Sequence, residues 1–182
     1  MLNNKGGRRA YLNDFVADEN GGYLYGGARY EPENGNIKSY CRLLGVVMTV
    51  ITAVSAASGC ISAEGSTNCF YVVLPLLFEL IAVLLADAAT VKVLRSEKPL
   101  REYIYVKSAK RIPIFLFCAA GSAAAGAVCT GIYIALNGVG ERAAETVIYI
   151  VLKLAAAALS FAAAQRFREQ KFVKILPAKK DT

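Results

Sequence analysis

Four apolar stretches, each about twenty residues long, are the feature of this chain that most restricts its fold. They cover residues 43–61, 70–94, 112–136 and 146–165. A helix needs about 20 apolar residues to cross a hydrocarbon core about 30 Å thick. Charged residues gather outside these stretches, where they avoid the roughly 2.5–3.5 kcal/mol that a charge costs at the centre of a bilayer. The pattern therefore predicts an all-α integral membrane protein with four transmembrane helices.

The composition also favours a membrane protein over a soluble one. Apolar residues make up 55% of the chain, against roughly 45–50% in ordinary soluble domains. The net charge of +7 would favour nucleic-acid binding in a soluble protein. Here the lysines and arginines flank the apolar stretches, where they orient a membrane protein and contact anionic lipid headgroups. We therefore expect the lipid bilayer and its anionic headgroups as partners, and no nucleic acid.

Lysine and arginine are distributed unevenly among the polar segments, and this predicts the orientation. Residues 1–42, 95–111 and 166–182 are rich in both. The link at residues 62–69 has neither, and the link at residues 137–145 has only Arg142. Because basic segments stay on the cytoplasmic side, both termini are predicted to be cytoplasmic in a multi-pass protein of the cell membrane. The short outer links predict two antiparallel helical hairpins that form a four-helix bundle.

The chain accordingly divides into three parts. Residues 1–42 form a polar N-terminal segment, in which two aromatic-rich runs around Gly21-Gly22 predict a small β-hairpin. Residues 43–165 form the transmembrane bundle. Residues 166–182 form a basic tail, whose first part is expected to continue the fourth helix until Pro177 stops it. The link before the third span is expected to form a short amphipathic helix at the membrane surface.

Three ionisable residues interrupt the apolar stretches, and such residues are functional candidates in a membrane. Glu79 and Lys153 both lie about 12–14 Å from the outer ends of their spans, so we hypothesise an intramembrane ion pair. Three interpretations stay open: a structural lock between helices, a part of a polar path, or two unpaired residues. Asp87 lies further inward on the second span, where the sequence favours pairing with a nearby basic residue over a relay from Glu79.

Small residues and cysteines supply the remaining candidates. Gly121 and Ala125, like Ser122 and Gly126, form small-xxx-small pairs in the third span. Such pairs predict close packing against the alanine-rich fourth span, with a homodimer seam as the alternative. Cys60 and Cys69 flank the first outer link and are candidates for a disulfide.

Other kinds of chemistry find little support. The chain has no histidine, which excludes histidine-based acid–base catalysis, and its cysteines lack the spacing of a zinc site. No nucleophile–base arrangement and no phosphate-binding loop is recognisable. We therefore expect no catalytic residues, no metal and no cofactor, and an enzyme is the least favoured class.

Two classes of function remain. In the first, the protein is an accessory, scaffold or interaction subunit whose N-terminal segment binds a membrane protein partner. In the second, it is a small transporter or channel that works as a homo-oligomer, with a polar path through Glu79, Asp87 and Lys153. Four spans alone rarely enclose a path, so the sequence favours the first class.

Overall fold

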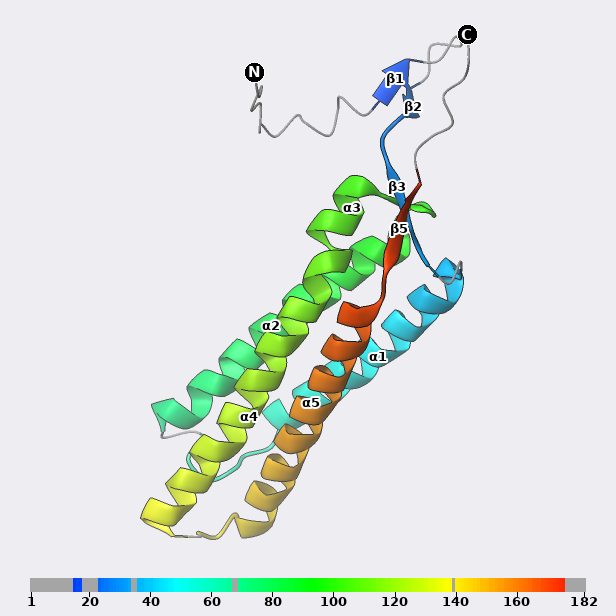
Figure 1. Ribbon diagram of the computed structural model, residues 1–182. Coiled ribbons are helices and arrows are strands. Elements are labelled where there is room, and N and C mark those ends of the chain that lie inside the picture. Colours follow the sequence, from blue (N-terminus) through cyan, green and yellow to red (C-terminus); the bar gives the residue numbers. More distant parts are fainter. Residues whose placement is uncertain (1–14, 18–22, 34–35, 67–68, 139, 176–182) are drawn as a thin grey trace.

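The computed structural model describes residues 15–17, 23–33, 36–66, 69–138 and 140–175. Its described part is mostly helical and is dominated by four long helices (Figure 1). These are α1 (Ile37–Gly59), α2 (Phe70–Arg95), α4 (Ile112–Asn137) and α5 (Ala143–Glu169). Each is long and apolar enough to cross a membrane. They fall on the four apolar stretches of the sequence.

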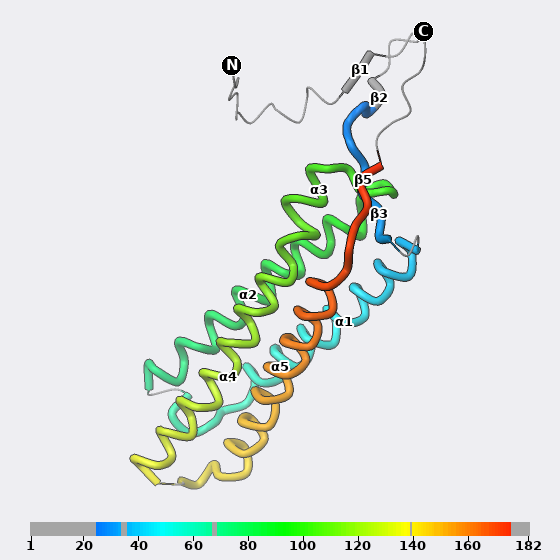
Figure 2. The backbone as a smooth tube through the Cα atoms, in the orientation of Figure 1, coloured from blue at the N-terminus to red at the C-terminus, as the bar shows by residue number. Residues whose placement is uncertain are grey.

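The four helices form a bundle in which each helix packs on two neighbours (Figures 1 and 2). Helix α4 packs on α2 and α5, and α1 closes the ring by packing on α2 and α5 from the other side. Helices α2 and α5 therefore sit across the bundle from each other. Helix α1 packs more loosely than α4 does, so the seam between α1 and α2 is one of the open sides of the bundle.

Local sequence signals set the helix ends. Asn36 caps α1, because its Oδ1 accepts a hydrogen bond from the Ser39 N–H at 3.0 Å. Helix α1 consequently begins six residues before the apolar stretch does. Pro113 lies in the first turn of α4, where its missing N–H has no intrahelical partner to lose. Gly138, at φ 82°, ends α4 in a conformation that favours glycine.

Short strands from distant parts of the chain meet at one end of the bundle. Strand β3 (Arg29–Pro32) lies between β4 (Leu100–Arg101) and β5 (Phe172–Ile175), and both pairings are antiparallel. Helix α3 (Glu102–Lys107) and the 3-10 helix η2 (Ala109–Arg111) follow β4. We call this end the basic end, because lysines and arginines gather on the helix ends, links and strands there. A further antiparallel pair, β1 (Phe15–Ala17) and β2 (Tyr23–Tyr25), falls within the two aromatic-rich runs of the N-terminal segment.

Strand β5 corrects the prediction that the fourth helix continues toward Pro177. Helix α5 ends at Glu169, Gln170 is extended, and the chain then pairs with β3. As a strand, β5 pairs its backbone N–H and C=O groups with those of β3 and stays against the bundle. A longer helix would extend beyond the end of the bundle. The strand also seats the Phe172 ring against Tyr40 and Tyr105. The fold is therefore mostly helical rather than entirely helical.

An aromatic cluster joins the sheet to the helices. Tyr30 on β3 stacks on Tyr105 of α3, with ring centroids 4.3 Å apart. Tyr40 of α1 contacts Phe172 at 5.4 Å and Phe167 of α5 at 5.9 Å, both edge to face. Edge-to-face and offset contacts of this kind stabilise by about 0.5–1.5 kcal/mol per pair beyond their buried area. The cluster therefore anchors β3, α3 and β5 to one end of the bundle.

The opposite end, which we call the link end, is joined by polar contacts. The Glu64 N–H donates to Thr146 Oγ1 at 2.9 Å, and Glu64 Oε1 accepts from the Arg142 N–H at 3.1 Å. Gly65, at φ 78°, packs so closely on the Tyr133 ring that a Cβ there would lie only 2.9 Å from it. The first link is thus docked on the second helical hairpin.

Large apolar side chains cover much of the outer surface of the bundle. They include Phe78, Leu84, Val128, Val147 and Val151, each more than half exposed. A soluble monomer rarely exposes a continuous apolar surface of this extent. This surface is what lipid tails would cover, and it agrees with a membrane location.

Candidate functional site

Glu79 and Lys153 meet in the interior of the bundle. The Lys153 ammonium donates a hydrogen bond to Glu79 Oε2, and the two form a salt bridge. The Lys153 side chain is 0% exposed and that of Glu79 is 1% exposed. The structure therefore brings together the two residues of the ion-pair hypothesis. Because α2 and α5 lie across the bundle from each other, the pair connects the two helical hairpins.

Helix α4 makes room for this contact. A Cβ added to Gly126 would lie 3.7 Å from Lys153 Cδ and 3.7 Å from Pro75 Cβ. The Lys153 stem thus passes α4 at Gly126 on its way to α2. Tyr149, one turn earlier on α5, places its ring centroid 5.2 Å from the ammonium, which adds a cation–π contact. The second carboxylate oxygen of Glu79, Oε1, has no hydrogen-bond partner among the described residues.

Asp87 faces a different neighbour. Its Oδ2 accepts a hydrogen bond from Thr52 Oγ1 of α1 at 2.8 Å. No salt bridge joins it to a basic side chain in the described part of the chain. This corrects the expectation that Asp87 pairs with a nearby lysine or arginine. Glu79 thus points to α5 and Asp87 to α1, so the structure does not bring these two carboxylates together.

Asp87 lines a groove of about 1130 Å³ between α1 and α2. The groove runs from Lys38 to Ala56 along α1, which is about 27 Å at 1.5 Å per residue. Asp87 lies eight residues before the basic end of α2, or about 12 Å into the helix. The groove is therefore about as long as the hydrocarbon core is thick. Asp87 meets Thr52 about 21 Å along α1 from Lys38, so its carboxylate lies toward the end of the groove opposite the basic mouth.

The α1 wall of this groove includes small residues at a regular spacing. Gly45, Thr49 and Ala53 all line the groove and follow one another at intervals of four residues. Residues four apart lie on one face of a helix, and small residues there let another helix approach closely. The sequence analysis considered the charged residues of the spans and overlooked this spacing in the first span.

The α2 wall carries a second polar group. Thr90 is 3% exposed, and its Oγ1 has no hydrogen-bond partner among the described residues. Three cations, Lys38, Arg42 and Lys98, line the mouth at the basic end. The groove therefore combines a long apolar floor, a carboxylate far from the basic mouth, and a hydroxyl without a hydrogen-bond partner among the described residues.

The small residues of the third span divide between two faces of α4. Gly126 is buried and Ser122 half-buried, whereas Gly121 and Ala125 are exposed. No atom lies within 4 Å of a Cβ built on Gly121. Only the Ser122–Gly126 pair therefore faces the interior, and a homodimer seam on the Gly121 face stays a prediction.

Cys60 and Cys69 are not joined in the structure. Both are free thiols, with Cys60 exposed just after α1 and Cys69 half-buried just before α2. The link between them is held instead by docking on α4 and α5 through Glu64 and Gly65. The described residues contain no group of three or more Cys, Asp or Glu side chains that could hold a metal ion.

No protein-family model matches the chain, and neither a curated protein nor a solved structure matches it. Its function therefore has to be argued from the geometry of the bundle.

Proposed function

We propose that this protein is an interaction subunit of a membrane assembly, and that its α1–α2 groove receives a transmembrane helix of another protein. The observation that carries the proposal is Asp87, a carboxylate within the span of α2 that lines an open groove. Among the described residues, its side-chain hydrogen bond comes from Thr52. A carboxylate in a span costs about 2.5–3.5 kcal/mol at mid-membrane unless a partner compensates it. An occupant that brings a cation or a donor to this depth would supply that compensation.

The shape of the groove favours a helix over a lipid tail. Its floor is about 27 Å long, and the Gly45-Thr49-Ala53 wall permits close backbone approach. An acyl chain would fill the apolar floor but offers no donor to Asp87 or to Thr90. A helix with one lysine or arginine at the level of Asp87, and acidic residues near its cytoplasmic end, would complement both the carboxylate and the basic mouth.

A second copy of this chain fits the groove less well. The basic residue that the chain carries at mid-span is Lys153, and that side chain is enclosed and paired with Glu79. A homodimer would leave Asp87 without a cation. The same pairing leaves the transporter alternative with less support, because two of its three path residues already neutralise each other.

The orientation with both termini in the cytoplasm belongs to this proposal. Segments before α1, between α2 and α4, and after α5 share one antiparallel sheet, which supports placing these three segments on one side of the membrane. This side also holds most of the basic residues, which favours the cytoplasm. Part of the N-terminal segment already pairs with the rest of the chain, because β3 is the central strand of the sheet. We therefore propose the groove, and not the N-terminal segment, as the partner site.

Site-specific photo-crosslinking in the native membrane tests the proposal. A photoreactive residue is placed in the full chain at Val50 or Val91 in the groove, and at Val128 or Val147 on the outer faces of α4 and α5 as controls. We expect crosslinks from the groove positions to one membrane protein, mapped by mass spectrometry to a transmembrane helix with a basic residue. Asp87→Asn should weaken this product by ~10-fold, or about 1.4 kcal/mol, because a neutral amide no longer pairs with the cation of the partner helix. Asp87→Glu, which keeps the charge, should retain the product.

Three outcomes would overturn the proposal. Equal crosslinking at the α4 and α5 controls would mean that the groove is not a specific site. Crosslinks to lipid alone would mean that lipid fills it. Crosslinks to a second copy of this chain, together with ion or substrate flux in proteoliposomes that Asp87→Asn abolishes, would establish the transporter alternative instead.

A further inference from the structure

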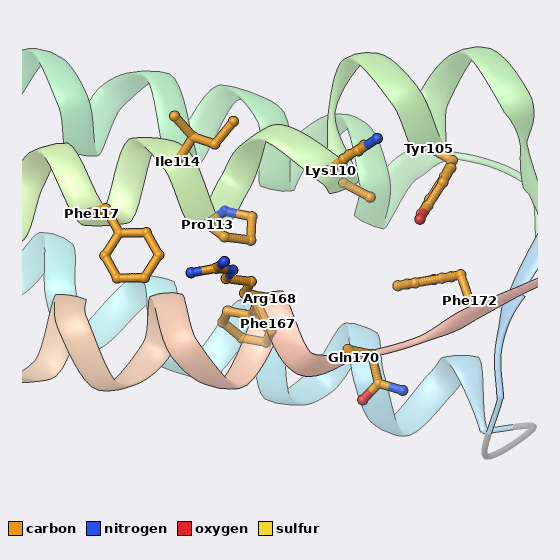
Figure 3. A pocket seen from close by; sticks show the side chains of 10 residues that line it. Tyr105, Lys110, Pro113, Ile114, Phe117, Phe167, Arg168, Gln170 and Phe172 are labelled. Atoms are coloured by element: carbon orange, nitrogen blue, oxygen red, sulfur yellow. The ribbon is translucent and has the colours of Figure 1, made fainter.

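A second pocket lies at the basic end, on the seam between α4 and α5. It has a volume of about 410 Å³ (Figure 3). Its walls come from α3, η2, the first turns of α4, the last turn of α5 and the start of β5. The aromatic cluster supplies Tyr105, Phe167 and Phe172. This pocket shares no lining residue with the α1–α2 groove.

Two cations line the pocket from opposite helices. Lys110 belongs to η2 at the start of α4, and Arg168 belongs to the last turn of α5 (Figure 3). Neither forms a salt bridge with a carboxylate in the described part of the chain. The residues that line the pocket include no aspartate or glutamate. Gln170 and the Tyr105 hydroxyl add polar groups on the Lys110 side of the pocket, whereas the Arg168 guanidinium lies beside Pro113 (Figure 3). With two cations and no carboxylate in its lining, the pocket is suited to an anion.

The part of the pocket that lies further along α4, away from the basic end, is apolar. From Lys110 the wall continues through Pro113 and Ile114 to Phe117, about 10 Å further along the helix axis. There the Phe117 ring meets Phe161 of α5 edge to face, with centroids 5.7 Å apart, and closes the seam. Ile114 is more than half exposed on the outer surface of the bundle. The pocket thus passes from cations at the membrane surface to an apolar wall within the first turns of a predicted span.

We propose that this pocket binds an anionic glycerophospholipid, with the phosphate between Lys110 and Arg168 and the first part of one acyl chain along Ile114 and Phe117. Basic pockets between transmembrane helices on the cytoplasmic side commonly hold anionic headgroups. A free phosphate would match the cations but would leave the apolar wall unused, which is why a lipid is the occupant. The inference stands apart from the α1–α2 groove, because it rests on other residues and needs no protein partner.

Native mass spectrometry of the full chain in detergent measures this binding directly. Phosphatidylglycerol and phosphatidylcholine with identical acyl chains are titrated onto the wild type and onto the Lys110→Gln/Arg168→Gln variant. We expect one phosphatidylglycerol to be retained in preference to phosphatidylcholine. The double variant should bind phosphatidylglycerol ~30-fold more weakly, as expected for two cations that each contribute about one kcal/mol at the surface.

The matched control removes the same charge from the same end. Lys107→Gln/Arg166→Gln replaces two exposed cations that do not line the pocket, and it should leave phosphatidylglycerol binding within about two-fold of the wild type. Lys110→Arg/Arg168→Lys, which keeps both charges, should also retain the lipid, and it separates the loss of charge from a change of side chain at these positions. An equal loss in both glutamine variants would overturn the site in favour of diffuse attraction to the basic end.

A soluble headgroup separates a lipid from a free anion. Glycerophosphoglycerol, which has the same phosphodiester without acyl chains, should fail to displace phosphatidylglycerol at a hundred-fold excess. Phe117→Ala should weaken lipid binding and leave any binding of this soluble anion unchanged. Displacement by glycerophosphoglycerol, or indifference to Phe117→Ala, would show that the pocket takes a small anion and not a lipid.

Discussion

Lys153 crosses the bundle interior to reach a carboxylate on the opposite helix, and this contact adds an ion pair to the packing between the two helical hairpins. Burying an ion pair stabilises little in itself, because desolvation offsets much of the attraction. Removing one partner is different, since it leaves an uncompensated charge in an apolar interior. We therefore interpret the pair as a lock that specifies how the hairpins dock, and its strength is best measured through single and double substitutions.

Lys153→Met should lower the free energy of unfolding by about 3–5 kcal/mol, because it leaves Glu79 buried without a cation. Glu79→Gln in the same chain should restore part of this loss. Folded yield and unfolding in detergent measure both effects in a double-mutant cycle. Lys92→Met, which replaces an exposed lysine near the end of α2, is the control and should change stability by less than about 0.5 kcal/mol. Strict additivity of the two interior substitutions would contradict a coupled pair.

Gly126 and Gly121 lie on the same helix but differ in surroundings, which gives a matched comparison. A Cβ at Gly126 would make ordinary contact with Lys153 and Pro75, whereas a Cβ at Gly121 would meet nothing within 4 Å. Gly126→Ala should therefore be tolerated. Gly126→Leu should cost about 1–3 kcal/mol by overpacking the Lys153 stem, while Gly121→Leu should be near neutral in thermal unfolding. Equal effects of the two leucine substitutions would show that the Gly126 face is not packed as described.

At the scale of elements, β5 is the segment for which the sequence-based prediction was wrong, because a continued helix was expected there and a strand is found. Its four residues could extend α5 as readily as form a strand, since the run is too short for periodicity to decide. Two tertiary contacts favour the strand. One is pairing with the edge of β3, and the other is the contact of Phe172 with Tyr40 of α1 and Tyr105 of α3. The side chains of β5 then differ in surroundings: Phe172 is half-buried against Tyr40 and Tyr105, and Val173 is exposed.

Phe172→Ala should release β5 from the bundle. The cost should be about 1–2 kcal/mol, below the roughly 3–5 kcal/mol of a fully buried phenylalanine, because Phe172 is only half-buried. Amide hydrogen exchange of β3 should then accelerate by ~10-fold or more, since its pairing with β5 is lost. Val173→Ala is the control and should leave the exchange of β3 unchanged. Protection of β3 that survives Phe172→Ala would mean that the aromatic cluster does not hold the strand.

At the scale of the whole molecule, the two ends of the bundle are held together differently. The basic end joins three segments through β3 and the aromatic cluster. The link end joins two short links through Glu64. Segments that share one sheet cannot lie on opposite sides of a membrane, so the fold restricts the topology independently of the charge distribution.

Cysteine labelling of intact and inverted vesicles tests that topology. In a chain whose five cysteines are replaced by serine, single cysteines are placed at Lys98, Lys174 or Glu141. A membrane-impermeant maleimide should label positions 98 and 174 only in inverted vesicles and position 141 only in intact ones. Labelling of positions 98 and 174 from different sides would contradict the shared sheet, and labelling of both only in intact vesicles would reverse the proposed orientation.

The sequence by itself determined the number of long apolar helices, their approximate bounds and the positions of the charged residues along them. These properties follow from apolar length and from the cost of a charge in lipid, both of which are local. Counting depth was enough to suggest that Glu79 could meet Lys153. Only the tertiary structure decided that Asp87 turns to Thr52, that the sheet joins three distant segments, and that α1 and α2 leave a groove between them. Those features depend on which helix faces meet, and the shapes of side chains distant in sequence set those contacts.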